Sequence, residues 1–193
     1  MMDSVVSNSQ SVLDFWFGSP AGAYRKQWFR KDPDFDAQIK NQFLELYWAM
    51  VTSSAEPWLR TAKASLARII MLDQFARNMF RGTPQSFATD SQALATSEKM
   101  IEQGYDAELM SVERFFLYLP FEHSENLVHQ NRCVEYFEAL AMEAPELESG
   151  LDYARRHRDV IAQFGRFPHR NEILGRPSTQ AELDFLKQPG SRF

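Results

Sequence analysis

The stretch Leu66-Ala-Arg-Ile-Ile-Met-Leu-Asp-Gln-Phe-Ala-Arg-Asn-Met-Phe80 decides the fold of this chain. Apolar side chains occupy nearly every side of a helix drawn through it, and a helix that is apolar all round is normally buried. Its second half nevertheless carries Asp73 and Arg77, followed by Arg81, at i, i+4 spacing on one strip. Because a buried charge must be paired, we predict an ion pair between Asp73 and Arg77.

Helical periodicity continues outward from this stretch in both directions. Apolar residues recur at helical spacing from Phe35 to Met50, after Asp34 as a cap, and again between Asp90 and Gly104. No alternating run predicts a strand, and valine and isoleucine are sparse. We therefore predict an all-α fold of roughly eight helices joined by short turns.

No break in composition divides the chain. We predict a single domain over residues 1–193, in which residues 1–10 form a loose N-terminal segment. Near the other end, Thr179 and Glu182 form a capping box for a short last helix. At 193 residues and 44% hydrophobic content, the chain is long enough to bury a sizeable core.

Composition narrows the classes of function. A net charge of −5 argues against a nucleic-acid partner, which would usually require a basic balance. The longest apolar run, Phe115 to Phe121, is far too short for a membrane span, and no secretory signal opens the sequence. The single cysteine, Cys133, fits a reducing compartment. We expect a soluble cytoplasmic protein with neither nucleic-acid nor membrane partners.

Two further helices turn polar side chains toward the core. His157 lies in the middle of the apolar face of the segment from Leu151 to Phe164, and Gln130 shares the inner side of the helix that contains Val134. Buried polar groups need partners. We therefore predict that these side chains meet Asp73 and Arg77 in one polar network.

Two loops are placed to close that network. In the first, Pro120 is expected to end a helix, and Glu122 and His123 then precede a helix that begins at Ser124. The second loop begins where Gly165 ends a helix in a left-handed conformation. It carries several side chains suited to a polar site, namely Arg166, His169, Arg170, Asn171 and Arg176.

Three long motifs carry a family resemblance: Leu72-Asp-Gln-Phe-Ala-Arg-Asn-Met-Phe-Arg-Gly-Thr83, Phe115-Phe-Leu-Tyr-Leu-Pro-Phe-Glu-His-Ser-Glu125 and Phe164-Gly-Arg-Phe-Pro-His-Arg-Asn171. They resemble those of an uncharacterised bacterial family, domain-of-unknown-function family 924. The resemblance implies a tetratricopeptide-like fold of antiparallel helix pairs stacked side by side. Ala76 departs from the proline expected in many relatives. The family has no established activity, so the resemblance implies no catalytic role.

These patterns favour an internal pocket for a small anionic or polar molecule. The expected acid–base residues are Glu122, His123, His157 and His169. The expected ligand-binding residues are Asp73, Arg77, Arg81, Gln130, Arg166, Arg170 and Asn171. The histidines match no compact metal signature, and no phosphate-loop, dinucleotide or Gly-x-Ser-x-Gly pattern occurs, so neither a metal nor a cofactor is predicted.

Two other interpretations stay open. The same polar residues suit a purely structural role that ties helices together, and the tetratricopeptide-like fold is typical of modules that bind a protein or peptide partner. The sequence therefore leaves open whether the chain is an enzyme, and it carries no signal for the oligomeric state.

Overall fold

A computed structural model describes residues 2–18 and 25–193, and every regular element within them is helical. The α-helices are α1 (Met2–Phe17), α2 (Pro33–Thr52), α3 (Ala62–Ile69), α4 (Ala76–Met79), α5 (Asp90–Glu102), α6 (Ser111–Glu122), α7 (Leu127–Glu143), α8 (Ser149–Phe164) and α9 (Gln180–Phe185). Short 3₁₀ turns join several of them. The predicted all-α class is confirmed.

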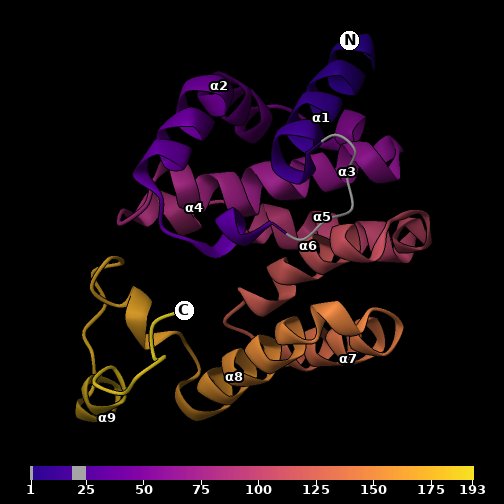
Figure 1. Ribbon diagram of the computed structural model, residues 1–193. Coiled ribbons are helices and arrows are strands. Elements are labelled where there is room, and N and C mark those ends of the chain that lie inside the picture. The colour runs from indigo at the N-terminus through magenta and orange to yellow at the C-terminus, as the bar shows by residue number, and fades with distance from the viewer. Residues whose placement is uncertain (1, 19–24) are drawn as a thin grey trace.

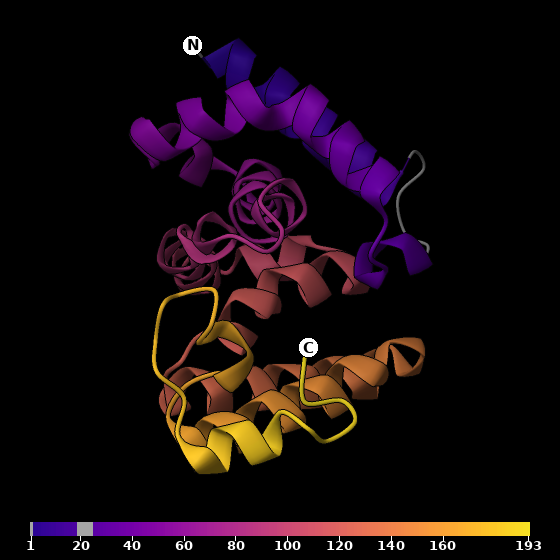
Figure 2. The ribbon, with the colours of Figure 1, turned by 90° about the vertical axis from the view of Figure 1, so that its left-hand side faces the viewer.

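The helices are stacked approximately in chain order (Figures 1 and 2). Helices α1 and α2 form one end of the stack, α3 to α6 form the middle, and α7 and α8 form the other end. The segment after α8 folds back, so that the C-terminal end lies between the middle helices and α8 (Figure 2). This return brings residues of the last segment beside helices that precede it by many turns.

The stretch Leu66–Phe80 forms the central rod, and it departs from regular α-helix. A π-helical segment, Ile70–Phe75, joins α3 to α4, so the three pieces run as one continuous helix. When they are counted together, the described residues contain eight helices, as expected from periodicity. The π-helical turn precedes Ala76, so no proline is needed to distort the helix at this point. Such turns are frequent at functional sites.

Several helix boundaries differ from the sequence prediction. Asp32, and not Asp34, caps α2, because its side chain accepts hydrogen bonds from the backbone N–H groups of residues 34 and 35. Thr89 is the residue before α5, so Asp90 begins that helix. Pro120 lies inside α6 and does not end it, and the cap of α7 is Asn126, not Ser124.

Both ends of the chain show defined helices. Helix α1 starts at Met2, so residues 2–10 are helical where we expected a loose segment. The capping box of α9 is confirmed, because Thr179 and Glu182 exchange side-chain-to-backbone hydrogen bonds of 3.2 and 2.7 Å. In the described part of the chain, no helix is both long and apolar enough to cross a membrane.

Helices α6 and α8 run parallel in a fixed register. Short turns reverse the chain before and after α7, which leaves α6 and α8 pointing the same way. Phe115 lies against Gly150, and two turns later Glu122 lies against His157, so both helices advance by seven residues between the two contacts. This register holds the polar ends of α6 and α8 together.

The register predicts a strict size limit at Gly150. A Cβ atom there would lie 2.5 Å from the ring of Phe115 and 2.6 Å from that of Phe137. We expect Gly150→Ala to lower the free energy of unfolding by about 1–3 kcal/mol, because overpacking outweighs the better helix propensity of alanine. Urea unfolding measures this loss. Ser149→Ala, at the exposed neighbouring position, should change stability by less than about 0.5 kcal/mol. Equal stability of the two variants would contradict the register.

Candidate functional site

A cavity of about 660 Å³ lies between the end of the central rod, α6, α8 and the loop that follows α8. Its polar lining includes Gln74, Arg77, Asn78, Arg81, Glu122, His123, His157, His169 and Arg170. Its apolar lining includes Trp28, Phe29, Phe87, Phe115, Leu119, Tyr153, Ile173 and Phe193. The cavity is therefore large enough for a small organic molecule and is polar on only part of its wall.

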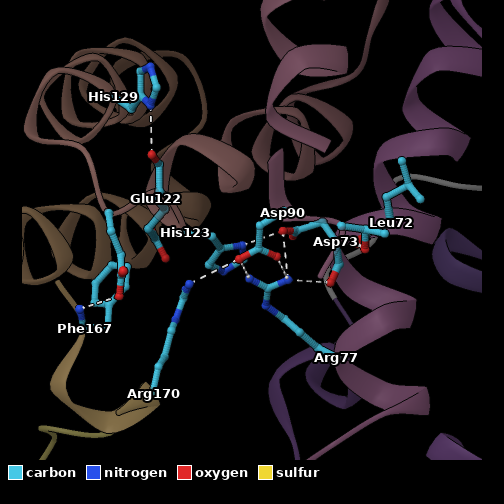
Figure 3. Close-up of polar contacts among 12 residues, drawn as sticks. Leu72, Asp73, Arg77, Asp90, Glu122, His123, His129, Phe167 and Arg170 are labelled. Carbon is cyan, nitrogen blue, oxygen red and sulfur yellow. Dashed lines mark hydrogen bonds and ion pairs between the residues drawn. The ribbon is translucent and has the colours of Figure 1, made fainter. Parts of the chain in front are cut away.

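A buried carboxylate lies behind the polar wall. Asp73, fully buried in the π-helical turn, contacts His123 Nδ1 at 2.7 Å and Arg77 Nη1 at 3.1 Å (Figure 3). Burial alone would raise the pKa of Asp73, but the charge of Arg77 and the contact with His123 hold it well below its usual range. Asp73 is therefore ionised, and the predicted Asp73–Arg77 pair is confirmed.

The contact with Asp73 fixes the state of His123. An ionised carboxylate only accepts hydrogen bonds, so Nδ1 of His123 carries the proton and donates it to Asp73. Burial lowers the pKa of His123, and the charge of Arg77 lowers it further, against the opposing pull of Asp73. His123 is therefore neutral near pH 7, and its Nε2 has a free lone pair.

Asp90 links two arginines across the site. Both of its oxygens accept from Arg77, at 2.9 and 3.0 Å, and one also accepts from Arg170 at 3.2 Å (Figure 3). The guanidinium of Arg170 lies between the rings of Phe87 and Phe167, 4.6 and 4.5 Å from their centroids. Burial lowers the pKa of Arg170 to about 10, so it remains a cation at neutral pH.

Glu122 has the opposite character to Asp73. Its burial, together with the negative charge of Asp73, raises its pKa to about 8, although Arg77 pulls the other way. Near neutral pH it is therefore a protonated carboxylic acid. Its Oε1 lies 3.4 Å from His157 Nδ1, which also donates to the carbonyl oxygen of Tyr153 at 2.8 Å.

The other two histidines that line the cavity, His157 and His169, are neutral as well. Burial lowers the pKa of His157 well below its usual range, and burial lowers that of His169 to about 3. The ring of Phe193 lies over His157 with 3.8 Å between centroids. His157 is thus covered by an aromatic ring and tied to its own helix, whereas the hydrogen bond to Asp73 leaves Nε2 of His123 available.

Some of the unpaired buried polar atoms belong to residues that line this cavity. In the described part of the chain, seven buried side-chain nitrogen or oxygen atoms have no hydrogen-bond partner. Three of them belong to cavity residues: Oε2 of Glu122, Nδ1 of His169 and Nε of Arg170. Buried polar groups in folded proteins are nearly always paired. These three atoms belong to residues in the wall of the cavity, and the fold itself leaves them without a partner.

The cavity has a local excess of positive charge. Arg77 and Arg170 share the carboxylates of Asp73 and Asp90, and Arg81 is paired with Asp36 at 2.7 Å. Arg30 and Lys31 also line the cavity. Within the described residues, neither forms an ion pair. In a chain of net charge −5, these two cations leave the mouth attractive to an anion.

Besides Asp73, which lies behind the wall, three further expected ligand-binding residues lie outside the cavity lining and form hydrogen bonds within the fold. Gln130 is fully buried and donates to the carbonyl oxygens of residues 122 and 124 at 2.6 and 2.7 Å, which closes the end of α6. Arg166 forms a two-point ion pair with Glu182 at 2.7 and 2.9 Å. Asn171 bonds Arg176 and Ser178 at 3.0 Å each.

Several residues of the site were not predicted from the sequence, among them Asp90 and Phe193. Asp90, which opens the helical pattern that runs to Gly104, also pairs with Arg77 and Arg170, and the sequence gives no signal for these contacts. Phe193 gave no signal, since its position depends on the path of the last segment back to α8. Among the described residues, no three His, Cys, Asp or Glu side chains are arranged to hold a metal ion.

The raised pKa of Glu122 predicts a pH dependence of stability. Between pH 4.5 and about 8 the carboxyl is ionised in the unfolded chain but protonated in the folded one. The folded state then binds more protons, so stability falls as pH rises, by up to about 1.4 kcal/mol per pH unit from this group. Glu122→Gln should remove this component. Urea unfolding at several pH values from 5 to 8 measures this component. If the free energy of unfolding depends on pH in the same way in Glu122→Gln and in the unchanged protein, a raised pKa of Glu122 is contradicted.

Comparison with known proteins agrees with the fold and supplies no activity. A solved structure of a protein of unknown function from Agrobacterium tumefaciens superposes with a TM-score of 0.86 at 35% sequence identity, covering 95% of this chain and 98% of that one. No curated protein matches the chain. The sequence model for bacterial proteins of unknown function of the DUF924 family matches residues 12–190. The chain therefore belongs to the DUF924 family.

Proposed function

We propose that the cavity binds a small anionic molecule and that Glu122 and His123 exchange protons with it. The observation that carries this proposal is the pairing, in one cavity, of a neutral imidazole oriented by Asp73 with a carboxyl whose pKa is about 8. Groups whose environments separate their pKa values in this way are suited to act as base and acid together.

His123 is suited to accept the proton. Its Nδ1 is fixed by the 2.7 Å hydrogen bond to Asp73, which leaves Nε2 unprotonated. A carboxylate in this position also stabilises the imidazolium that forms when Nε2 takes a proton. Arg77 holds Asp73 ionised from the other side, so the base is ready at neutral pH.

Glu122 is suited to donate the proton. It follows directly before His123, at the end of α6, and lines the same cavity. Its pKa of about 8 keeps it protonated at pH 7. Because this pKa lies close to pH 7, the group can also release the proton readily. Its Oε2 has no partner within the described structure.

Arg170 is the best candidate to hold the anion. Arg77 is fully engaged by Asp73 and Asp90, whereas Arg170 shares only one oxygen of Asp90 and leaves Nε unpaired. A guanidinium suits carboxylate and phosphate groups because its N–H groups donate in a fixed fork. The cations Arg30 and Lys31 would favour entry of the same charge.

Isothermal titration calorimetry with phosphate and malonate tests the anion site. We expect binding at pH 6.5 that weakens at pH 9, because ionised Glu122 then repels the anion. Glu122→Gln should remove most of this pH dependence. Arg170→Met should weaken binding by about 10-fold or more, since a hydrogen bond to a charged group contributes about 1.5–3 kcal/mol.

Arg155→Met is the matched control, because Arg155 is an exposed arginine of α8 paired with Glu138 away from the cavity. It should bind both anions as the unchanged protein does. Arg170→Lys keeps the charge and guards against a general loss of structure. If folded Arg170→Met binds as well as the control, or if neither anion binds the unchanged protein, the polar cluster is structural. A role in binding a protein partner would then be favoured.

A further inference from the structure

The two parallel helices give the cavity a direction. On α6, the cavity-lining residues Phe115, Leu119 and Glu122 follow one another along a single face. On α8, Gly150 lies level with Phe115, and His157 lies level with Glu122. At a rise of 1.5 Å per residue, the two levels are about 10 Å apart. Both helices therefore change from apolar or small side chains to polar ones in the same direction.

The apolar level is built from rings that contact one another. Phe29 packs on Phe115 with 5.8 Å between ring centroids, and Leu119 lies one turn further along α6. Phe29 and Tyr153 are about half exposed although both line the cavity, at 52% and 47%. Large apolar side chains that stay accessible in a concave site mark a surface for an apolar partner group.

We propose that the anion bound at Arg170 carries an apolar tail, so that the ligand is a small carboxylate with a straight hydrocarbon or aryl chain. The carboxylate lies at the level of Arg170, His123 and Glu122, and the tail extends along α6 past Leu119 toward Phe115. This inference rests on the proposed function, because it assigns the substrate class of the same site.

The size and chemistry of the cavity favour this class over a bare inorganic anion. A volume of about 660 Å³ is far larger than phosphate requires. A bare anion at Arg170 would leave the half-exposed rings of Phe29 and Tyr153 facing water. A tail would cover them and gain about 0.8 kcal/mol for each buried methylene. One ligand then pairs with the charge of Arg170 and covers the accessible apolar wall.

A homologous series of straight-chain carboxylates, from acetate through butanoate and hexanoate to octanoate, tests the assignment by calorimetry. The burial of each methylene corresponds to about a fourfold gain in affinity. We expect the affinity to rise by about this factor per methylene and to level off when the chain reaches Phe115. The corresponding alcohols, which have the tail without the charge, should bind far more weakly at every length.

Variants test the contacts of the apolar tail and those of the carboxylate separately. Leu119→Asn and the milder Tyr153→Ser should flatten the series and leave acetate binding unchanged. Val128→Ser, at an apolar residue of α7 that is 60% exposed and does not line the cavity, is the control. Arg170→Met should lower the affinity for every carboxylate by a similar factor.

The outcomes distinguish the two proposals. If acetate binding depends on Arg170 but longer chains bind no better, the proposal of an apolar tail is wrong and the proposed anion site is retained. If Arg170→Met binds every carboxylate as tightly as the unchanged protein does, the cavity takes up apolar chains without recognising the charge, and both proposals fail. A flat series in which Leu119→Asn and Tyr153→Ser have no effect also overturns the tail.

Discussion

The buried carboxylate of Asp73 is the interaction on which the rest of the site depends. It lies in the π-helical turn of the central rod, fully shielded from solvent. An ionised group in that position is tolerated only when charges and hydrogen bonds replace its lost hydration. Arg77, Gln74 and His123 supply them, at 3.1, 2.6 and 2.7 Å. This one charge thereby fixes α6 against the rod, because His123 directly follows that helix.

Asp73 affects the rest of the site in two ways, through a chain of contacts and through its charge. Through Arg77, it orders Asp90 at the start of α5, which in turn holds Arg170 of the loop after α8. Through the electrostatic field, it raises the pKa of Glu122 and keeps that carboxyl protonated. Two neighbouring carboxyl groups thus have opposite states, because Arg77, His123 and Gln74 stabilise the charge of Asp73 while Glu122 lies next to that charge.

Periodicity was sufficient to predict which helices turn polar side chains inward. Asp73, Arg77 and His157 all lie where helical spacing placed them, because the apolar face of a helix is visible in the sequence. What these side chains contact was predictable only for Asp73 and Arg77, which are neighbours on one helix. Gln130 shows the limit, since its inward direction was correct but its amide closes the end of α6 instead of reaching the cavity.

The parts of the site that escaped prediction depend on the path of the chain between helices. Asp90 reaches Arg170, 80 residues later, only because α5 and the loop after α8 meet at α6. Phe193 covers His157 only because the last segment returns to the middle of the stack (Figure 2). Local patterns carry no information on such long-range contacts. The π-helical turn around Asp73 likewise has no signature in spacing, because it interrupts the spacing itself.

A structural role and a ligand site make different demands on the hydrogen bonds of this network. A network that only joins helices gains stability by closing every hydrogen bond, as Arg166 does with Glu182 and Asn171 does with Arg176. Around the cavity, Glu122, His169 and Arg170 each keep a buried polar atom open, at a cost to stability. The closed pairs hold the loop in place, and the open atoms belong to residues that line the volume that the loop helps to enclose.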